Sequence, residues 1–307
     1  MLKTKLLYLF ALFVIICSNT IIAQEPEVVV SEDFSIRDFI ISKDSIFYIK
    51  KRTACLYEKK TKSNKCFFIG GYGIKLNTKE HSNTVITVSN ELVDTVCSVR
   101  FYNKKKDKFE AEYYYKKGKI LDYLNIPEAS LFVLSLTNNK IIFVDYQERP
   151  KFHKIIEIKQ NSFCRKLIYK NNILYFATDN GNVYKYNFHS YKKTLLYSAN
   201  KLITEFTIND STLIYTTIEG DISKVNLDSK TKTNVKIKNN FISTILLTQN
   251  KLICGSWNGR VYILDNNKFT IEKELNIHKR AILKIKKYDK KIYSSSLDNT
   301  IKSWELN

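Results

Sequence analysis

Histidine and carboxylate side chains are the residues of this chain best suited to acid–base chemistry. His278 lies near the C-terminal end and Asp298 follows twenty residues later, so a fold that joined them could form a general acid–base pair. The other three histidines, His81, His153 and His189, do not cluster with His278 or with one another along the chain. The sequence contains no nucleophile elbow, no glycine-rich phosphate loop and no His-Glu-x-x-His motif. Residue types therefore offer one acid–base candidate and no catalytic or cofactor-binding motif.

The cysteines could form a disulfide, but they do not form a metal-binding motif. The sequence contains Cys17, Cys55, Cys66, Cys97, Cys164 and Cys254, with no Cys-x-x-Cys pair. Cys55 and Cys66 flank the centre of a predicted hairpin, so they could face each other across adjacent strands and pair in an oxidising compartment. Buried free thiols are the alternative. No metal site is predicted, because the histidines and cysteines lack ligand spacing.

The acid–base candidate belongs to a repeated pattern of strand, tight turn and strand. In the last repeat, alternating apolar residues predict strands at 281–285, 291–296 and 300–306, with a turn at Asp298 and Asn299. The same pattern occurs four more times upstream. Its turn markers are Asn139, Gly181, Gly220, Gly259 and Asn299, at intervals of 42, 39, 39 and 40 residues. Such a period is typical of a stacked repeat architecture.

The last repeat resembles the WD40 family, whose repeat carries a Gly-His pair, a Ser-x-Asp turn and a closing Trp-Asp in a blade of four strands. The resemblance rests on His278, Ser294, Asp298 and Trp304. Two positions depart from the pattern, with Ile277 in place of Gly and Glu305 in place of Asp. The resemblance implies that the four matching side chains form a hydrogen-bonded network that holds the blade together. We therefore expect this network to be structural and not catalytic.

The repeat length sets the expected number of blades. At about 40 residues per blade, residues 24–307 correspond to a single all-β domain, a seven-bladed β-propeller of four-stranded antiparallel blades. The abundance of Tyr, Phe, Ile and Thr agrees with an all-β chain. Blade one is expected at residues 35–41, 45–50, 53–58 and 65–70, blade two at about 71–117, and blade three at about 119–158.

The two ends of the repeat array predict how the ring closes. The sequence ends after the third strand of the last repeat, so blade seven lacks an outer strand. The β-branched segment at residues 27–31 has no partner in blade one. We expect this N-terminal strand to complete blade seven and remove an exposed edge. A disordered leader is the alternative.

Residues 1–23 have the pattern of a secretory signal peptide. A basic start precedes an apolar run at residues 6–16, and cleavage is expected after Ala23. The run is shorter than the ~20 residues that a spanning helix needs, although a retained anchor is an alternative. A lipoprotein anchored at Cys17 is less expected, because the large Ile16 precedes it. We expect export to the periplasm, cell envelope or medium, and no transmembrane span in the mature chain.

The net charge has two interpretations. The formal net charge is +20 at pH 7, and lysine supplies most of it. Lysine lacks the planar fork that arginine uses to bind phosphate and bases, so a solvated lysine-rich surface is one interpretation. Attraction to an anionic lipid surface, polymer or glycan is the other. Nucleic acid is the least expected partner because the protein is expected to be exported.

We expect a monomeric, non-enzymatic scaffold that needs no cofactor and binds a protein partner through its blade loops. Trp257 occupies a turn between two strands, and tryptophan is a frequent interface anchor. The candidate partner-binding residues are Trp257, Arg260, Leu297 and Ile218. A binder of an anionic polymer or glycan is one alternative. A propeller enzyme with carboxylates or histidines converging on the central channel is another.

Overall fold

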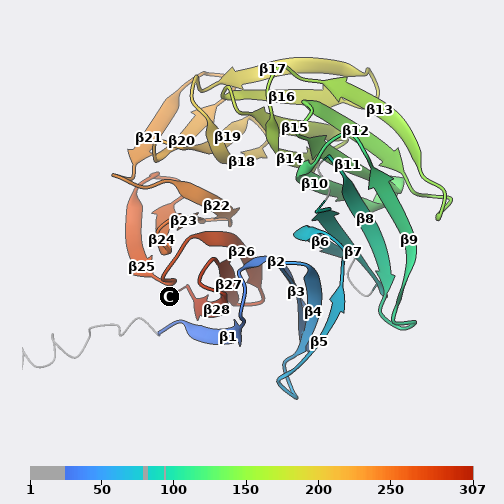
Figure 1. The fold of residues 1–307 in the computed structure, drawn as a ribbon. Helices are drawn as coiled ribbons and strands as arrows, with labels where there is room; N and C mark the ends of the chain where they lie inside the picture. The colour runs from blue at the N-terminus through green and yellow to red at the C-terminus, as the bar shows by residue number, and fades with distance from the viewer. Residues whose placement is uncertain (1–24, 79–81, 93–94, 307) are drawn as a thin grey trace, which may run out of the picture.

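The computed structural model describes residues 25–78, 82–92 and 95–306, which form a ring of seven four-stranded antiparallel sheets around a central channel (Figure 1). This is the all-β, seven-bladed propeller that the sequence predicts. The predicted signal peptide, with Cys17 and Ala23, lies outside the described residues.

Each blade begins with a strand that lines the channel and ends with a strand at the rim. Blade one contains β2 (Ile36–Ile41), β3 (Ser45–Lys50), β4 (Thr53–Glu58) and β5 (Ser63–Phe68). Blade two contains β6 (Tyr72–Thr78), β7 (Thr84–Asn90), β8 (Cys97–Asn103) and β9 (Lys108–Tyr115). Blade three contains β10 (Ile120–Ile126), the short 3-10 helix η1 (Pro127–Ala129), β11 (Leu131–Leu136), β12 (Lys140–Asp145) and β13 (His153–Lys159).

Blade four contains β14 (Cys164–Lys170), β15 (Ile173–Thr178), β16 (Asn182–Asn187) and β17 (Lys192–Ser198). Blade five contains β18 (Ile203–Asn209), β19 (Thr212–Thr217), β20 (Asp221–Asn226) and β21 (Lys232–Lys236). Blade six contains β22 (Ile242–Leu247), β23 (Lys251–Ser256), β24 (Arg260–Asp265) and β25 (Ile271–Asn276). Blade seven combines β26 (Ile282–Tyr288), β27 (Lys291–Ser296) and β28 (Thr300–Glu305) with β1 (Glu27–Ser31).

The turn markers that set the sequence period have a backbone conformation that few residues adopt. All five have positive φ, from 59° at Asn139 to 86° at Gly259. Glycine and asparagine tolerate this region better than other residues. At Gly259 a Cβ would also collide with the backbone carbonyl of His278, which lies in the loop between β25 and β26. The period is therefore visible in the sequence because the turn geometry restricts the residue type.

Apolar side chains fill the seven interfaces between neighbouring blades. Between blades six and seven, for example, Ile253 and Val261 pack with Ile282, Ile292 and Trp304. A separate cluster lies at each of the other six interfaces. Each sheet is thus covered on both sides by its neighbours, which explains why β3, β11 and β23 are buried along most of their length.

The N-terminal strand closes the ring. β1 pairs antiparallel with β28, with Glu27 opposite Ser303 and Ser31 opposite Thr300. Val30 is buried in the cluster between blades seven and one, whereas Val28 faces solvent. The expected closure by residues 27–31 is therefore confirmed.

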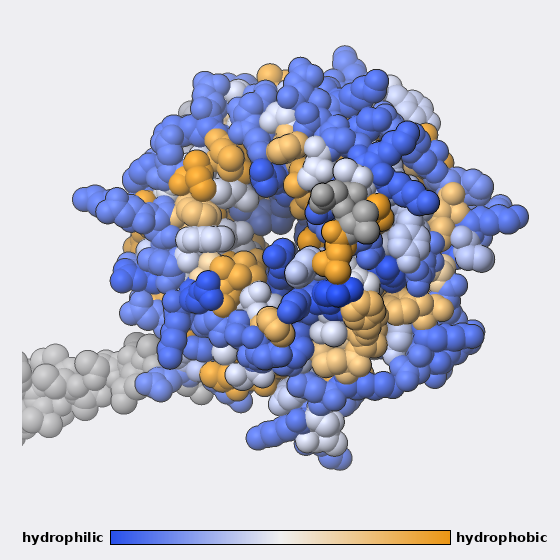
Figure 2. Space-filling view, viewed as in Figure 1, coloured by the Kyte–Doolittle hydropathy of each residue, from blue (hydrophilic) through white to orange (hydrophobic). Residues whose placement is uncertain are grey.

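No helix in the described part of the chain has the length and apolarity needed to cross a bilayer. Figure 2 shows hydrophilic side chains over most of the rim of the ring, and apolar side chains gathered around the central opening.

Removing residues 25–31 should lower the stability of the ring. The truncation leaves β28 as an unpaired edge and removes Val30 from the core, so we expect a lower melting temperature and concentration-dependent aggregation. Thermal denaturation and size-exclusion chromatography would measure both. A truncation of residues 25 and 26 alone, which precede β1, is the matched control. If the longer truncation melts like the control, β1 does not stabilise the ring.

Candidate functional site

The channel is lined at one level by a ring of charged side chains. Each inner strand has a β-bulge after its first residues, and the residue after the bulge occupies the same position in every blade. In blade order these residues are Asp38, Lys75, Asp122, Lys166, Glu205, Thr244 and Lys284, which we call the charge ring. Acid and base alternate around the ring except at Thr244.

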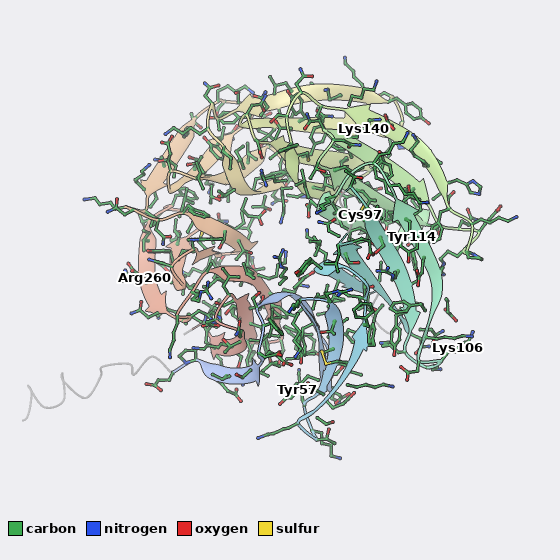
Figure 3. The ribbon with its side chains drawn as sticks, viewed as in Figure 1. Tyr57, Cys97, Lys106, Tyr114, Lys140 and Arg260 are labelled. Atoms are coloured by element: carbon green, nitrogen blue, oxygen red, sulfur yellow. A yellow bond between two sulfur atoms is a disulfide. The ribbon has the colours of Figure 1, made fainter. Side chains whose placement is uncertain are left out.

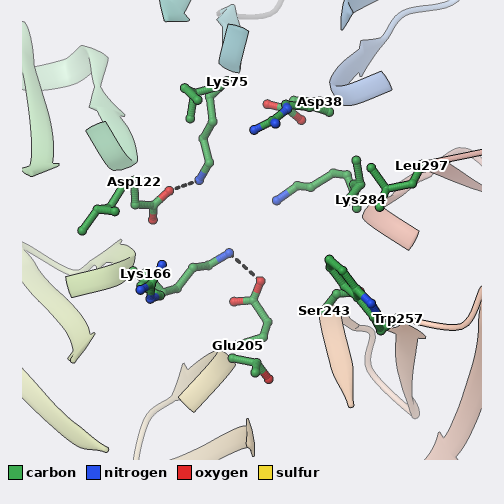
Figure 4. A pocket seen from close by; sticks show the side chains of 15 residues that line it. Asp38, Lys75, Asp122, Lys166, Glu205, Ser243, Trp257, Lys284 and Leu297 are labelled. Carbon is green, nitrogen blue, oxygen red and sulfur yellow. Dashed lines mark hydrogen bonds and ion pairs between the residues drawn. The ribbon is translucent and has the colours of Figure 1, made fainter. Parts of the chain in front are cut away.

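Two of the three lysines in the charge ring form ion pairs with the acid of the next blade. Lys75 pairs with Asp122, and Lys166 Nζ lies 2.7 Å from Glu205 Oε2 (Figure 4). Burial by itself would lower the pKa of Lys166, but Glu205 and Asp122 outweigh it and raise the pKa. Lys75 and Lys166 therefore act as cations whose charge is neutralised within the ring.

The aspartates of the charge ring also join neighbouring blades through backbone hydrogen bonds. The amide of Leu76 donates to Asp38 Oδ2 at 3.0 Å, and the amide of Leu167 donates to Asp122 Oδ2 at 2.7 Å. Asp38 also lies 3.4 Å from Lys286 Nζ. Burial would raise the pKa of Asp38, but Lys286 and Lys284 outweigh it and hold the pKa below its usual value. Both carboxylates are therefore occupied by hydrogen bonds and ion pairs within the protein.

Lys284 differs from the other ring lysines because it has no ion pair with any described residue. Its side chain extends toward the centre of the channel (Figure 4). The ammonium of Lys166, burial and the ammonium of Lys75 lower the pKa of Lys284 to about 7, although Asp38 and Glu205 oppose them. Lys284 is thus an uncompensated amine that titrates near neutral pH.

A cavity of about 380 Å³ opens above the charge ring. The bulge residues form part of its wall, with Arg37 and Arg165 among them, and Trp257 and Leu297 line its mouth. Trp257 is 50 % exposed and stacks on Phe241, with ring centroids 5.1 Å apart. The pocket therefore combines an ionic floor with an aromatic and apolar mouth.

The predicted partner-binding residues do not all lie together. Trp257 and Leu297 share the channel pocket, whereas Ile218 lines a neighbouring hollow with Phe241. Arg260 pairs with Glu274 of β25 and lies at the outer side of blade six (Figure 3). Sequence proximity to Trp257 suggested a shared surface, but strand pairing directs the Arg260 side chain toward β25.

Exposed apolar side chains concentrate on one face of the ring. The loops between the second and third strands, and those that lead into the next blade, lie at the same end of every blade, because the strands alternate in direction. We call this end the channel face. Its exposed large apolar residues are Phe34, Phe68, Tyr72, Leu92, Phe163, Ile218 and Trp257. The loops of the opposite face carry only Tyr191 among the described residues.

The histidine and aspartate that could have formed an acid–base pair hold blade seven together. His278 Nδ1 lies 2.9 Å from Asp298 Oδ2, and His278 Nε2 lies 2.6 Å from the Ser294 hydroxyl. Thr300 also donates to Asp298. Burial would raise the pKa of Asp298, but the hydrogen bonds from His278 and Thr300 outweigh it and hold the pKa well below its usual value.

Trp304 does not join this hydrogen-bonded network. Its indole Nε1 is buried without a hydrogen-bond partner among the described residues. Trp304 lies opposite Ile292, and the hydroxyl of Ser294, two residues further along β27, contacts His278 Nε2. Trp304 therefore stabilises blade seven by packing. The expected hydrogen-bonded network contains three of its four predicted side chains, His278, Ser294 and Asp298.

Cys55 and Cys66 form a disulfide. They are directly opposite each other on β4 and β5, with an S–S distance of 2.01 Å (Figure 3). Cys97, Cys164 and Cys254 are buried free thiols, and burial raises the pKa of Cys97 and of Cys164 to about 12. No described group of His, Cys, Asp or Glu has the arrangement of a metal site.

Sequence reasoning did not identify the charge ring. A usable signal exists in the regular half of the chain, where Lys166, Glu205, Thr244 and Lys284 follow one another at intervals of 39, 39 and 40 residues. These are the intervals of the turn markers. The buried Arg100 of blade two was also missed; it binds Glu91, Ser89 and Ser98 inside its sheet.

No family model and no curated protein matches this sequence. The fold is similar to that of solved structures. One is the crystal structure of the computationally designed protein Ika8, with a TM-score of 0.68, 10% sequence identity, and coverage of 91% of this chain and 98% of that chain. At this identity the likeness shows the fold alone. The class that fold and comparison define is the seven-bladed β-propeller.

Replacing Lys284 by methionine should stabilise the protein most below pH 7. The folded state disfavours the ammonium of Lys284. The resulting loss of stability is fully present below a pH of about 7 and fades as the pH rises toward the usual lysine pKa of 10.5. We expect Lys284→Met to raise the melting temperature at pH 6 by about 2 °C or more, with a smaller gain at pH 9.5. Lys287→Met, on an exposed position of the same strand, is the control. A lower melting temperature for Lys284→Met at pH 6 would show that the ammonium of Lys284 does not destabilise the folded state.

Proposed function

We propose that this protein is an exported, non-enzymatic propeller scaffold of the WD40-like type that binds a protein partner through its channel face. The observation that carries the proposal is the set of exposed apolar residues on this face, of which Trp257 lines the channel pocket together with Leu297. Exposed apolar patches of this kind are typical of protein–protein contacts. The His278, Ser294 and Asp298 network supports the likeness to WD40 repeats.

The disulfide supports export. Cys55 and Cys66 are bonded in an outer hairpin of blade one, and such bonds persist mainly in oxidising compartments. This agrees with the signal-peptide pattern of residues 1–23.

Trp257 is the expected anchor of the interface. It is half exposed, and its contact with Phe241 leaves the other side of the ring free to meet a partner. A stacked tryptophan is held in one orientation before binding, which reduces the entropy lost when the partner docks.

An enzyme is the second candidate, because three carboxylates and a lysine of lowered pKa converge on the channel. The carboxylates Asp38, Asp122 and Glu205 all contact lysines or backbone amides. An acid–base mechanism needs a carboxyl group free to exchange a proton with substrate. The occupied carboxylates therefore favour binding over catalysis. The alternative of an anionic polymer or glycan rests on the formal charge of +20.

Trp257→Ala should weaken partner binding with little effect on folding. Once a partner has been captured from cell-envelope extracts and purified, we expect the substitution to cost about 2 kcal/mol of binding free energy or more, or roughly 30-fold in Kd. The melting temperature should change little because Trp257 is half exposed. Leu195→Ala, an equally exposed position on the outer strand β17, is the control and should leave the affinity unchanged. A large loss of stability with unaltered affinity would assign Trp257 to packing.

Expression of the full chain in a secreting host should give an exported protein that begins at Gln24. Intact mass spectrometry would report the cleavage, and thiol labelling under denaturing conditions would report the bond between Cys55 and Cys66. Ala23→Arg should block cleavage and serves as the control. Recovery of the uncleaved chain with both thiols free would argue against export.

A further inference from the structure

We propose that the channel pocket takes up a carboxylate of an acidic peptide segment, bound by Lys284 and Arg37 beneath the apolar mouth. This inference rests on the proposed function and names the chemistry that the partner presents at the same pocket. The ligand's carboxylate would pair with Lys284, the lysine of the charge ring that has no ion pair with a described residue.

The first argument is the balance of charge around the pocket. Lys75, Lys166 and Arg165 are each neutralised by an acid, the last by Asp179 through contacts of 2.7 and 2.9 Å. Lys284 and Arg37 have no acidic partner in the described part of the chain, and both line the pocket. The excess positive charge is therefore confined to the side of the pocket formed by blades seven and one.

The second argument is the break in the alternation at blade six. Between Glu205 and Lys284 the ring has the neutral Thr244, so the blade next to Lys284 places no carboxylate in the ring. Ser243, the bulge residue of the same strand, directs its hydroxyl to backbone carbonyls of Gly255 and Ile282. No described side chain of blade six therefore compensates Lys284, and an anion entering the pocket meets no like charge there.

The third argument concerns the kind of molecule that carries the carboxylate. The pocket mouth is formed by Trp257 and Leu297, so groups next to the carboxylate enter apolar surroundings. A peptide can place leucine or phenylalanine beside an acidic residue. An acidic polysaccharide is polar along its whole length and gains less from this mouth. A volume of about 380 Å³ also suits one or two side chains better than a polymer strand.

The titration of Lys284 gives the binding a pH dependence. The groups that face it are the cations Lys166, Lys75, Lys286 and Arg37 and the anions Asp38, Asp122 and Glu205. With no ligand the pKa of Lys284 is about 7. A bound carboxylate favours the ammonium, so binding takes up a proton at neutral and higher pH. The affinity should fall by about fivefold between pH 7 and pH 8.

The test is a selection of random dodecapeptides displayed on phage against the disulfide-bonded mature protein at pH 6.5. We expect the enriched peptides to share an aspartate or glutamate flanked by apolar residues. A synthetic peptide of the enriched sequence should lose at least about tenfold in affinity in Lys284→Met and when its acid is replaced by the amide. Combining Lys284→Met in the protein with the amide replacement in the peptide should lower the affinity little more than either change alone.

Three further variants sharpen the result. Lys284→Arg keeps the positive charge, so it should retain binding and lose the pH dependence between pH 7 and 8. Lys287→Met, outside the channel pocket, should bind like the parent protein. Trp257→Ala should weaken the same peptide, because the mouth and the floor belong to one site.

Several outcomes would overturn the inference. Peptides that depend on Trp257 but not on an acid or on Lys284 would leave the proposed binding face standing and remove the carboxylate site. Enrichment of basic peptides, or Lys284-dependent binding of tetragalacturonic acid in the absence of any selected peptide, would assign the pocket to another class of ligand. If no peptide depends on either Lys284 or Trp257, both the inference and the proposed protein-binding face are wrong.

Discussion

Closure of the ring is the constraint on which the rest of this structure depends. A four-stranded sheet of this chain cannot bury both of its apolar faces alone, and each blade does so only by packing between two neighbours. The pairing of β1 with β28 joins the first blade to the last, so the packing continues around the ring. Without it, blade seven would have three strands and an open edge.

The inner strands meet at the channel, where closure brings seven equivalent positions close together. Like charges at such positions would repel one another in a partly dehydrated environment. The chain largely avoids this by alternating Lys75, Asp122, Lys166 and Glu205 around the channel. Asp38 and Asp122 also accept backbone hydrogen bonds from the next blade, so the same carboxylates balance charge and fix the spacing of the blades.

Lys284 is the exception to this balance of charge, and its ammonium does not stabilise the folded protein. Lys284 has no described counterion, and its lowered pKa indicates an unfavourable environment for the ammonium. Unfavourable groups of this kind concentrate at functional sites, where a ligand supplies the missing interaction. Lys284 lines the same pocket as Trp257 and Leu297, so this unmet charge lies next to apolar side chains of the channel face.

The propeller architecture could be predicted from the sequence alone, because turn geometry and strand alternation are local properties. Positive φ favours glycine and asparagine at the five turn markers, so the blade period is visible without a structure. The closing strand could be predicted because residues 27–31 form a strand without a neighbour in blade one. The pairing of Cys55 with Cys66 could be predicted because they face each other across one hairpin. The charge ring depended on tertiary structure, because its members lie about 40 residues apart and meet only when the ring closes. The contact between Arg260 and Glu274 also depended on tertiary structure, because the register of β24 against β25 places Glu274 diagonally across from Arg260 and within reach of its side chain.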